Sequence, residues 1–230
     1  MMIEPEILFE DPFLTVAVKP AGLLSERGNP AQSFAEQLAT RNPNGYVGVI
    51  HRLDRGVGGV MLYARTPDAA AHLSRQVQEG CLKKEYLAIL HGTPDASEGR
   101  LCDLLFFDRM RNKSFVVDRK RNGVKDAALS YRVLQSIEHP TYGALSLVRV
   151  ILETGRTHQI RVQFSSRGLP LVGDRRYGLA DDPVSPIALW SCHLSFCHPE
   201  SGAPMTFDLR PPAIAPWDMF NFPDMSTPVK

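Results

Sequence analysis

The stretch from Ile50 to Gly59 limits the possible folds and functions of this chain more than any other. It places a carboxylate among basic side chains on a glycine-rich turn. Arg52 and Arg55 flank Asp54, and an apolar run from 60 to 64 follows the glycines. Glycine permits tight or left-handed backbone, so a side chain can be presented where other residues would clash. Nearby positive charge favours the ionised form of the carboxyl. Asp54 is therefore either a reactive carboxylate in front of a buried strand or half of a surface ion pair.

Composition narrows the class of protein. The chain has 230 residues, of which 43% are apolar, and this suits one large domain or two small lobes. The net charge is only +1, so any surface that binds nucleic acid must be local. The four cysteines form no paired framework, and the acidic start does not resemble a signal peptide. No apolar run approaches the roughly 20 residues of a membrane span. We therefore expect a cytoplasmic protein that neither spans nor binds a membrane.

Local patterns predict short strands and three helices. Strands are expected at 7–9, 14–18, 60–64, 83–90, 128–134, 144–150, 189–196 and 205–209, each bounded by turn residues. Helices are expected at 33–40, 66–79 and 158–167, with Ser33, Thr66 and Thr157 as N-caps. Tyr86 lies in the strand 83–90, where it is either a core aromatic or a functional one. The Pro-rich tail from Pro211 is expected to lie on the surface.

The stretch from Arg109 to Lys125 is the most basic in the chain. It holds seven basic residues against one acid, Asp118, and its Asn122-Gly123 pair predicts a hairpin turn. Such a segment is either an ordinary solvated hairpin or an arm that contacts phosphates. In the second case the contacts are expected from Arg119, Lys120 and Arg121.

The stretch from Glu153 to Phe164 carries a second candidate group, Arg161. Ile160 and Phe164 are four residues apart and are expected to face the core, with Arg161 one turn into the same helix. A buried arginine needs a carboxylate partner, since an unpaired buried charge is costly. The pattern is compatible with a purely structural Arg–Asp or Arg–Glu pair.

Two Cys-His pairs near the C-terminus suggest zinc, but strand geometry argues against it. In a strand Cys192 and Cys197 point to opposite faces. His193 and Cys197 share a face, but they would lie about 13 Å apart at ~3.3 Å per residue. Zinc ligands bind at roughly 2.0–2.3 Å, so no metal site is expected there.

Several of these stretches together resemble one family. His51-Arg52-Leu53-Asp54, with Gly59 and Ala64-Arg65 after it, resembles the signature of the RluA family of RNA pseudouridine synthases. The Lys-Glu-Tyr-Leu-Ala pattern around Tyr86 and the run 153–164 resemble its second and third motifs. The likeness spans about 7 to 210. The family pattern usually has Thr and Ser where this chain has Val57 and Gly58, so two hydroxyls are missing near the turn.

The resemblance implies an α+β fold, with a bent, mostly antiparallel sheet, flanking helices, two fused lobes and a central cleft. It implies a catalytic domain at 1–222, with a tail at 223–230 and without the S4-type RNA-binding domain that other members carry. The implied reaction isomerises a uridine in transfer or ribosomal RNA. No cofactor or metal is needed, because the base is only detached, turned and rejoined through carbon-5. The implied partner is RNA rather than DNA, and the protein is expected to be a monomer.

The resemblance also implies roles for single residues. Asp54 is the expected nucleophile, Tyr86 stacks on the flipped uracil, and Arg161 pairs with Asp54, with Arg156 as the second choice. Arg52 fills the space that the flipped nucleotide leaves. His51, Arg55 and Arg156 are the further RNA contacts expected near Asp54.

Two other functions stay open at this point. One is an RNA-binding module on the same fold that has lost catalysis, which the replacements Val57 and Gly58 support. The other is an Asp-dependent hydrolase, although no second catalytic carboxylate near Asp54 and no Ser–His pairing is evident in the sequence.

Overall fold

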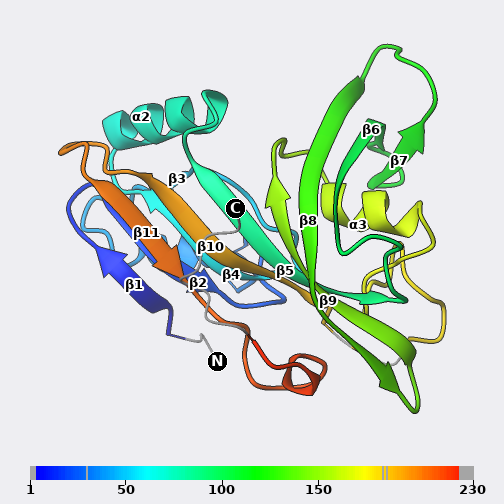
Figure 1. The fold of residues 1–230 in the computed structure, drawn as a ribbon. Helices are drawn as coiled ribbons and strands as arrows, with labels where there is room; N and C mark the ends of the chain where they lie inside the picture. The colour runs from blue at the N-terminus through cyan, green and yellow to red at the C-terminus, as the bar shows by residue number, and fades with distance from the viewer. Residues whose placement is uncertain (1–3, 30, 183, 185, 223–230) are drawn as a thin grey trace. The chain divides into compact units, whose positions relative to one another are not determined.

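The computed structural model describes residues 4–29, 31–182, 184 and 186–222 (Figure 1). The chain divides into two compact units. Unit 1 consists of Met1–Lys84 and Trp190–Pro211, and unit 2 consists of Glu85–Leu189 and Pro212–Lys230. Each unit has strands that pair mostly antiparallel and at least one helix, so the predicted α+β class is confirmed. The tail predicted at 223–230 lies outside the described residues.

Unit 1 is built on a sheet with the strand order β1-β2-β4-β10, and β3 pairs with β4 and β11 with β10. The β4–β10 pair is parallel, with Trp190 opposite Gly58, and the other pairs are antiparallel. The strands are β1 (Glu6–Glu10), β2 (Leu14–Lys19), β3 (Gly48–Val49), β4 (Gly58–Ala64), β10 (Leu189–Cys197) and β11 (Pro204–Asp208). The strands predicted for this part of the chain are therefore confirmed.

Helices cover both faces of β4, and this is why the strand is apolar along its whole length. In α2 (Pro67–Gln78), Leu73 belongs to the same core cluster as Leu62 of β4. In α1 (Phe34–Ala39), Phe34 lies 6.0 Å from the ring of Tyr63, whose side chain alternates to the other face. Both N-caps are as predicted, because the hydroxyls of Ser33 and Thr66 accept backbone hydrogen bonds at 3.1 and 3.2 Å.

Unit 2 is an antiparallel sheet with the strand order β5-β9-β8-β6-β7. The strands are β5 (Lys83–His91), β6 (Glu98–Asp108), β7 (Lys113–Val117), β8 (Val124–His139) and β9 (Gly143–Leu152). The helix α3 (Gln159–Ser165) packs on this sheet, and its Val162 shares a core cluster with Leu105 of β6. Strand β6 was not predicted, because four consecutive apolar residues at 104–107 interrupt any alternation.

The predicted hairpin at Asn122-Gly123 is wrong. Strands β7 and β8 pair with opposite edges of β6, so the turn before β8 carries the chain across the end of β6. The hairpin is instead the turn Arg109–Asn112 between β6 and β7, where Asn112 has a φ of 47°. An Asn-Gly pair indicates a turn, but it does not decide which strands the turn joins.

The predicted cap of α3 is also wrong. The N-cap is His158 in a left-handed conformation, with a φ of 55°, and it makes no capping hydrogen bond with its side chain. The preceding loop is held instead by Gln159, whose Oε1 accepts from the N–H of Arg156 at 2.9 Å and the hydroxyl of Thr154 at 2.8 Å. The carbonyl of Thr157 accepts from Ser114 Oγ at 2.6 Å.

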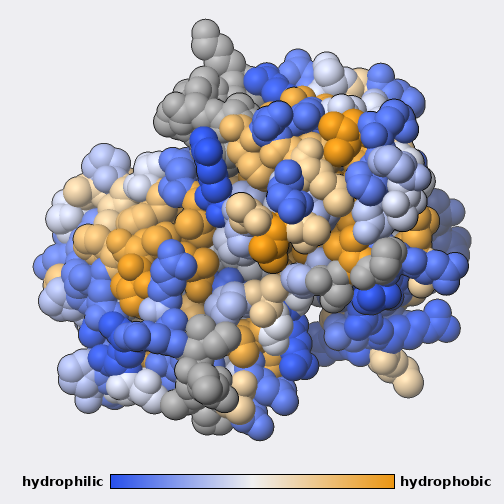
Figure 2. All heavy atoms as spheres, turned by 90° about the horizontal axis from the view of Figure 1, so that it is seen from below, coloured by the Kyte–Doolittle hydropathy of each residue, from blue (hydrophilic) through white to orange (hydrophobic). Residues whose placement is uncertain are grey.

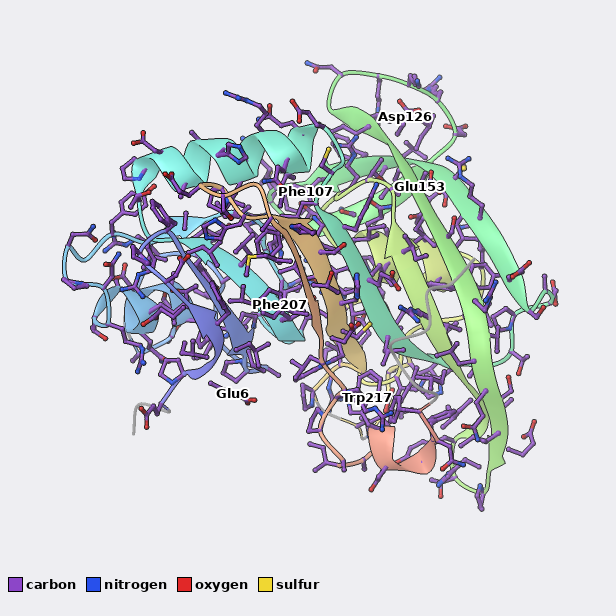
Figure 3. All side chains as sticks on the ribbon, turned by 60° about the vertical axis from the view of Figure 1, so that its left-hand side comes forward. Glu6, Phe107, Asp126, Glu153, Phe207 and Trp217 are labelled. Carbon is purple, nitrogen blue, oxygen red and sulfur yellow. The ribbon has the colours of Figure 1, made fainter. Side chains whose placement is uncertain are left out.

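The segment after Pro211 was predicted to lie on the surface, but the structure buries part of it. The short 3-10 helix η1 (Trp217–Met219) buries Trp217, which Figure 3 labels, and Phe220 is also only 5% exposed. The N–H of Asn221 donates to Gln135 of β8 at 2.9 Å. The segment therefore belongs to unit 2 and buries two large aromatic side chains. Within the described residues, no helix is both long and apolar enough to cross a membrane.

Candidate active site

The turn that carries Asp54 is fixed on both sides to the segment 19–25 of unit 1. Ser25 Oγ accepts from the N–H of Leu53 at 3.0 Å and donates to its carbonyl at 2.8 Å. On the other side, the N–H of Gly22 donates to the carbonyl of Arg55 at 2.7 Å, and Arg55 Nε donates to the carbonyl of Gly22 at 2.9 Å. The residues before and after Asp54 are therefore locked, and Asp54 itself is half-buried between them.

Lys19 is the least expected residue beside this turn. Its side chain is fully buried, and its ammonium donates to the carbonyls of Pro20 at 2.9 Å, Leu23 at 2.7 Å and Arg55 at 3.4 Å. Burial lowers the pKa of Lys19 to about 7, although the negative charge of Asp54 acts in the opposite direction. Lys19 thus ties both segments together and supplies a positive charge near Asp54.

His51 has a structural position rather than an exposed one. It is 7% exposed, and its Nε2 accepts from the N–H of Leu62 at 3.2 Å. Burial, together with the charge of Lys84, lowers the pKa of His51 to about 3, so its ring is neutral at pH 7. His51 therefore helps to hold the turn against β4, and its predicted contact with RNA stays a prediction. Arg52 is exposed and forms an ion pair with Glu26.

The two departures from the family pattern are packing positions. Val57 is 1% exposed. A Cβ on Gly58 would lie 2.4 Å from the Trp190 ring, and one on Gly59 would lie 2.3 Å from the carbonyl oxygen of Ser191. Gly59 also has a φ of 122°, a conformation that side-chain-bearing residues rarely adopt. Gly58 therefore accommodates a tryptophan from β10.

In unit 2, Arg161 makes a two-pronged ion pair with Asp174. Its Nε and Nη2 donate to the two carboxylate oxygens at 2.8 and 2.7 Å, and the Asp174 side chain is fully buried. Burial raises the pKa of the Asp174 carboxyl, but the Arg161 hydrogen bonds and charge outweigh this and hold the pKa below its ordinary value. The half-buried Arg161 therefore has the carboxylate partner that its burial requires. Its predicted pairing with Asp54 stays a prediction.

Tyr177 connects Arg161 to the start of strand β7. Its hydroxyl accepts from the N–H of Ser114 at 2.7 Å and is 3.0 Å from His158 Nδ1. The cations of Lys113 and Arg161 lie 4.8 and 5.2 Å from the centre of its ring. Asp174 and Tyr177 were not predicted as site residues, although the run Gly173-Asp174-Arg175-Arg176-Tyr177 combines an acid and two bases with an aromatic residue.

The remaining predicted residues occupy these places. Tyr86 lies in β5 opposite Val150 of β9 and is 5% exposed. Arg55 is exposed, and Arg156 Nε donates to the carbonyl of Asp126 at 2.9 Å. Asp126 is labelled in Figure 3, and its carboxylate lies 3.0 Å from the ammonium of Lys120.

Arg119 and Arg121 complete the basic segment, and both are exposed. The guanidinium of Arg121 lies 5.0 Å from the centre of the Phe106 ring, so it rests on β6. Their exposure leaves these charges in the solvent, where phosphates could reach them.

The histidines near the C-terminus pair with carboxylates. His193 Nδ1 is 2.8 Å from Asp208, and His198 Nε2 is 2.7 Å from Asp11. Among the described residues, no cluster of three or more His, Cys, Asp or Glu side chains could hold a metal ion. The face drawn in Figure 2 carries both hydrophilic and hydrophobic residues, as ordinary protein surfaces do, so hydropathy by itself does not mark a site on this face.

Comparisons with known proteins show which family the chain belongs to. A family model described as RNA pseudouridylate synthase matches residues 14–166. The ribosomal large subunit pseudouridine synthase D of Zymomonas mobilis is 32% identical over 90% of this chain and 69% of its own length. Its namesake in Nitrosomonas europaea is 36% identical over 86% of this chain and 59% of its own length. The human RNA pseudouridylate synthase domain containing 1 has a TM-score of 0.76 at 22% identity, over 91% of this chain and 84% of its own.

These matches confirm the family that the motifs indicated. The chain belongs to the RluA family of RNA pseudouridine synthases, which are isomerases. The human structure supports the fold alone, since its identity is low. The chain spans about two thirds or less of the length of the two bacterial relatives.

Proposed function

We propose that Asp54 is the covalent nucleophile of this enzyme. The observation that carries the proposal is the double fixation of its turn, in which Ser25 holds Leu53 and Gly22 holds Arg55. A nucleophile is most effective when its geometry is set before the substrate arrives. Carboxylates serve as nucleophiles in other enzymes, and they need no added base when they are ionised.

In the proposed reaction, the bond between uracil nitrogen-1 and the sugar breaks, the base turns, and carbon-5 joins the sugar instead. Carbon-5 then loses its proton and nitrogen-1 gains one, so the product is an isomer of the uridine. Asp54 forms a covalent bond either to the sugar carbon-1′ or to the uracil ring and is released at the end, so nothing is consumed. The uridine has to leave the stack before it reaches a half-buried carboxylate. Arg52, which is exposed, then occupies the space that the base leaves.

Tyr86 and Arg161 complete the proposed set. A buried tyrosine offers a flat face for the uracil and a hydroxyl for a proton. Arg161 supplies the counter-charge for Asp54, and its other side is already fixed by Asp174. Both assignments come from the resemblance, and the burial of each side chain is compatible with them.

Ribosomal RNA of the large subunit is the proposed substrate, ahead of transfer RNA. The support is that the two bacterial relatives are named as ribosomal large subunit pseudouridine synthases. We propose that RNA runs along the exposed Lys and Arg side chains of the segment 109–125, because phosphate contacts supply most of the affinity for nucleic acid. Arg119, Lys120 and Arg121 are proposed as such contacts, and Lys120 would exchange Asp126 for a phosphate.

The alternative of an inactive RNA-binding module loses its support. It depended on Val57 and Gly58, and both serve packing in unit 1. The Cβ of a serine at position 58 would lie 2.4 Å from the Trp190 ring, so packing against the tryptophan accounts for the missing hydroxyl without assuming a loss of catalysis.

Two assays test the proposal. Purified protein is incubated with unmodified transcripts of large-subunit ribosomal RNA and, separately, with a pool of transfer RNA transcripts, and pseudouridine is mapped in each. We expect a single strong site in the ribosomal transcript. Product only in transfer RNA would refute the substrate assignment, and no product in either RNA, together with RNA binding, would favour the inactive module.

The second assay measures how RNA affinity depends on salt. Replacing Arg119, Lys120 and Arg121 by alanine should lower the log–log salt slope by about two units, at ~0.7 per contact with single-stranded RNA. A control variant removes the same number of charges elsewhere, at Arg27, Arg41 and Arg75. An unchanged slope in the first variant would show that the segment is an ordinary solvated turn.

A further inference from the structure

The tip of the β6–β7 hairpin holds the most exposed large apolar side chain among the described residues. Met110 is 98% exposed, and the next values are 56% for Ile214 and 51% for Leu179. Arg109 and Arg111 flank it. A methionine in this position contributes nothing to the core of the free protein, because its apolar surface stays in water.

The tip is rigid rather than loose. Asp108 Oδ1 accepts from the N–H of Met110 at 2.9 Å and from that of Arg111 at 3.1 Å. Arg176 Nη1 donates to the carbonyls of Arg111 at 2.9 Å and Asn112 at 2.6 Å. The backbone of the turn is therefore hydrogen-bonded from both ends, so binding has to order only the Met110 side chain and not the loop that carries it.

The same contacts tie the tip to the segment that holds Arg161. The N–H of Arg176 donates to Asp174 Oδ1 at 2.9 Å, and Asp174 is the partner of Arg161. On the other side of the turn, Lys113 donates to the carbonyl of Arg176 at 2.8 Å. Asp174 thus holds a proposed catalytic arginine with its carboxylate oxygens and, through Arg176, the hairpin tip. RNA that reaches Arg161 would come close to this tip.

We infer that Met110 is a wedge that packs against an unpaired base of the RNA substrate, with Arg109 and Arg111 on the flanking phosphates. Apolar side chains such as methionine insert against unstacked bases in other nucleic-acid complexes. Specific recognition of RNA favours single-stranded loops, whose bases are free to stack on side chains. The inference rests on the proposed function and names the substrate class more closely, as RNA with an unpaired base beside the target.

The test compares two RNA probes, a synthetic stem-loop with a single-stranded loop and a fully paired duplex of the same length. Replacing Met110 by alanine should weaken stem-loop binding by about tenfold, the scale expected for losing one buried methionine contact. Duplex binding should not change. The salt slope should not change either, because no charge is lost, whereas Arg111→Ala should lower it by about 0.7.

Two further variants control for trivial causes. Met110→Leu keeps an apolar side chain of similar size and should restore stem-loop binding. Leu179→Ala truncates another exposed apolar side chain of unit 2 and should have no effect. Wild-type affinity in Met110→Ala would overturn the inference, and so would an equal loss on stem-loop and duplex. Pseudouridine formation by the wild type is scored separately, so a failure of the proposed function is distinguished from a failure of the wedge.

Discussion

Replacing Lys19 by methionine should have an effect on stability that depends strongly on pH. The side chain is fully buried, and methionine has nearly the same length without the charge. The variant leaves the carbonyls of Pro20 and Leu23 without their donor, at a cost of roughly 1–3 kcal/mol each. It also removes the cost of keeping an ammonium away from water, which acts in the opposite direction.

The pH window follows from the two pKa values of Lys19. The group ordinarily has a pKa of 10.5, and burial lowers it to about 7 in the folded protein. Between these values the unfolded chain holds a proton that the folded chain has released, so folding stability rises with pH. The gain is about 1.4 kcal/mol per pH unit. Below pH 7 both states are protonated, and the gain is absent.

The wild type should therefore differ little from Lys19→Met near pH 6, where the two costs nearly cancel. It should be more stable by about 3 kcal/mol at pH 9, from two pH units at ~1.4 kcal/mol each. Urea unfolding of both proteins across this range measures the difference. Lys125→Met is the control, since its ammonium is exposed and its replacement should give a difference that is flat with pH. A flat difference for Lys19 as well would refute the account of a depressed pKa.

Three further predictions concern the site and its support. Arg161→Met should lower the free energy of unfolding by ~3–5 kcal/mol, because Asp174 is left buried without its cation, and an unchanged melting temperature would contradict this. Gly58→Ser should cost ~1–3 kcal/mol through its clash with Trp190, and combining it with Trp190→Leu should recover most of the loss in a denaturant titration. Tyr86→Phe should keep RNA affinity and lose most turnover in a product assay, unless the hydroxyl has no part in the chemistry.

Local chemistry explains why much of the fold could be read from the sequence. Caps such as Ser33 and Thr66 act within one helical turn, so their pattern is visible in a short window. The apolar run of β4 likewise predicts a strand that is buried on both faces. Which strands pair with one another was harder to predict, because the order of β6, β7 and β8 depends on contacts between residues far apart in the chain. The hairpin was therefore placed at Asn122-Gly123 instead of Arg109–Asn112.

Only some residues of the candidate site could be predicted from the sequence, because the others depend on contacts with distant segments. Asp54 and Arg161 stand out because charged residues are unusual beside glycines and on a buried helix face. Lys19 and Asp174 do not stand out, since their roles depend on carbonyls and a guanidinium that other segments bring to them. His51 was assigned to RNA because of its neighbours, whereas its ring is used inside unit 1.

The most direct test of the account is a single-turnover measurement of pseudouridine formation with Asp54→Asn. Asparagine keeps the shape of the side chain and removes the nucleophilic charge. If Asp54 is the nucleophile, we expect no detectable product at saturating RNA, with RNA affinity and melting temperature close to those of the wild type. Product formation within about tenfold of the wild-type rate, a difference of only ~1.4 kcal/mol in the barrier, would contradict the assignment of Asp54 as the nucleophile.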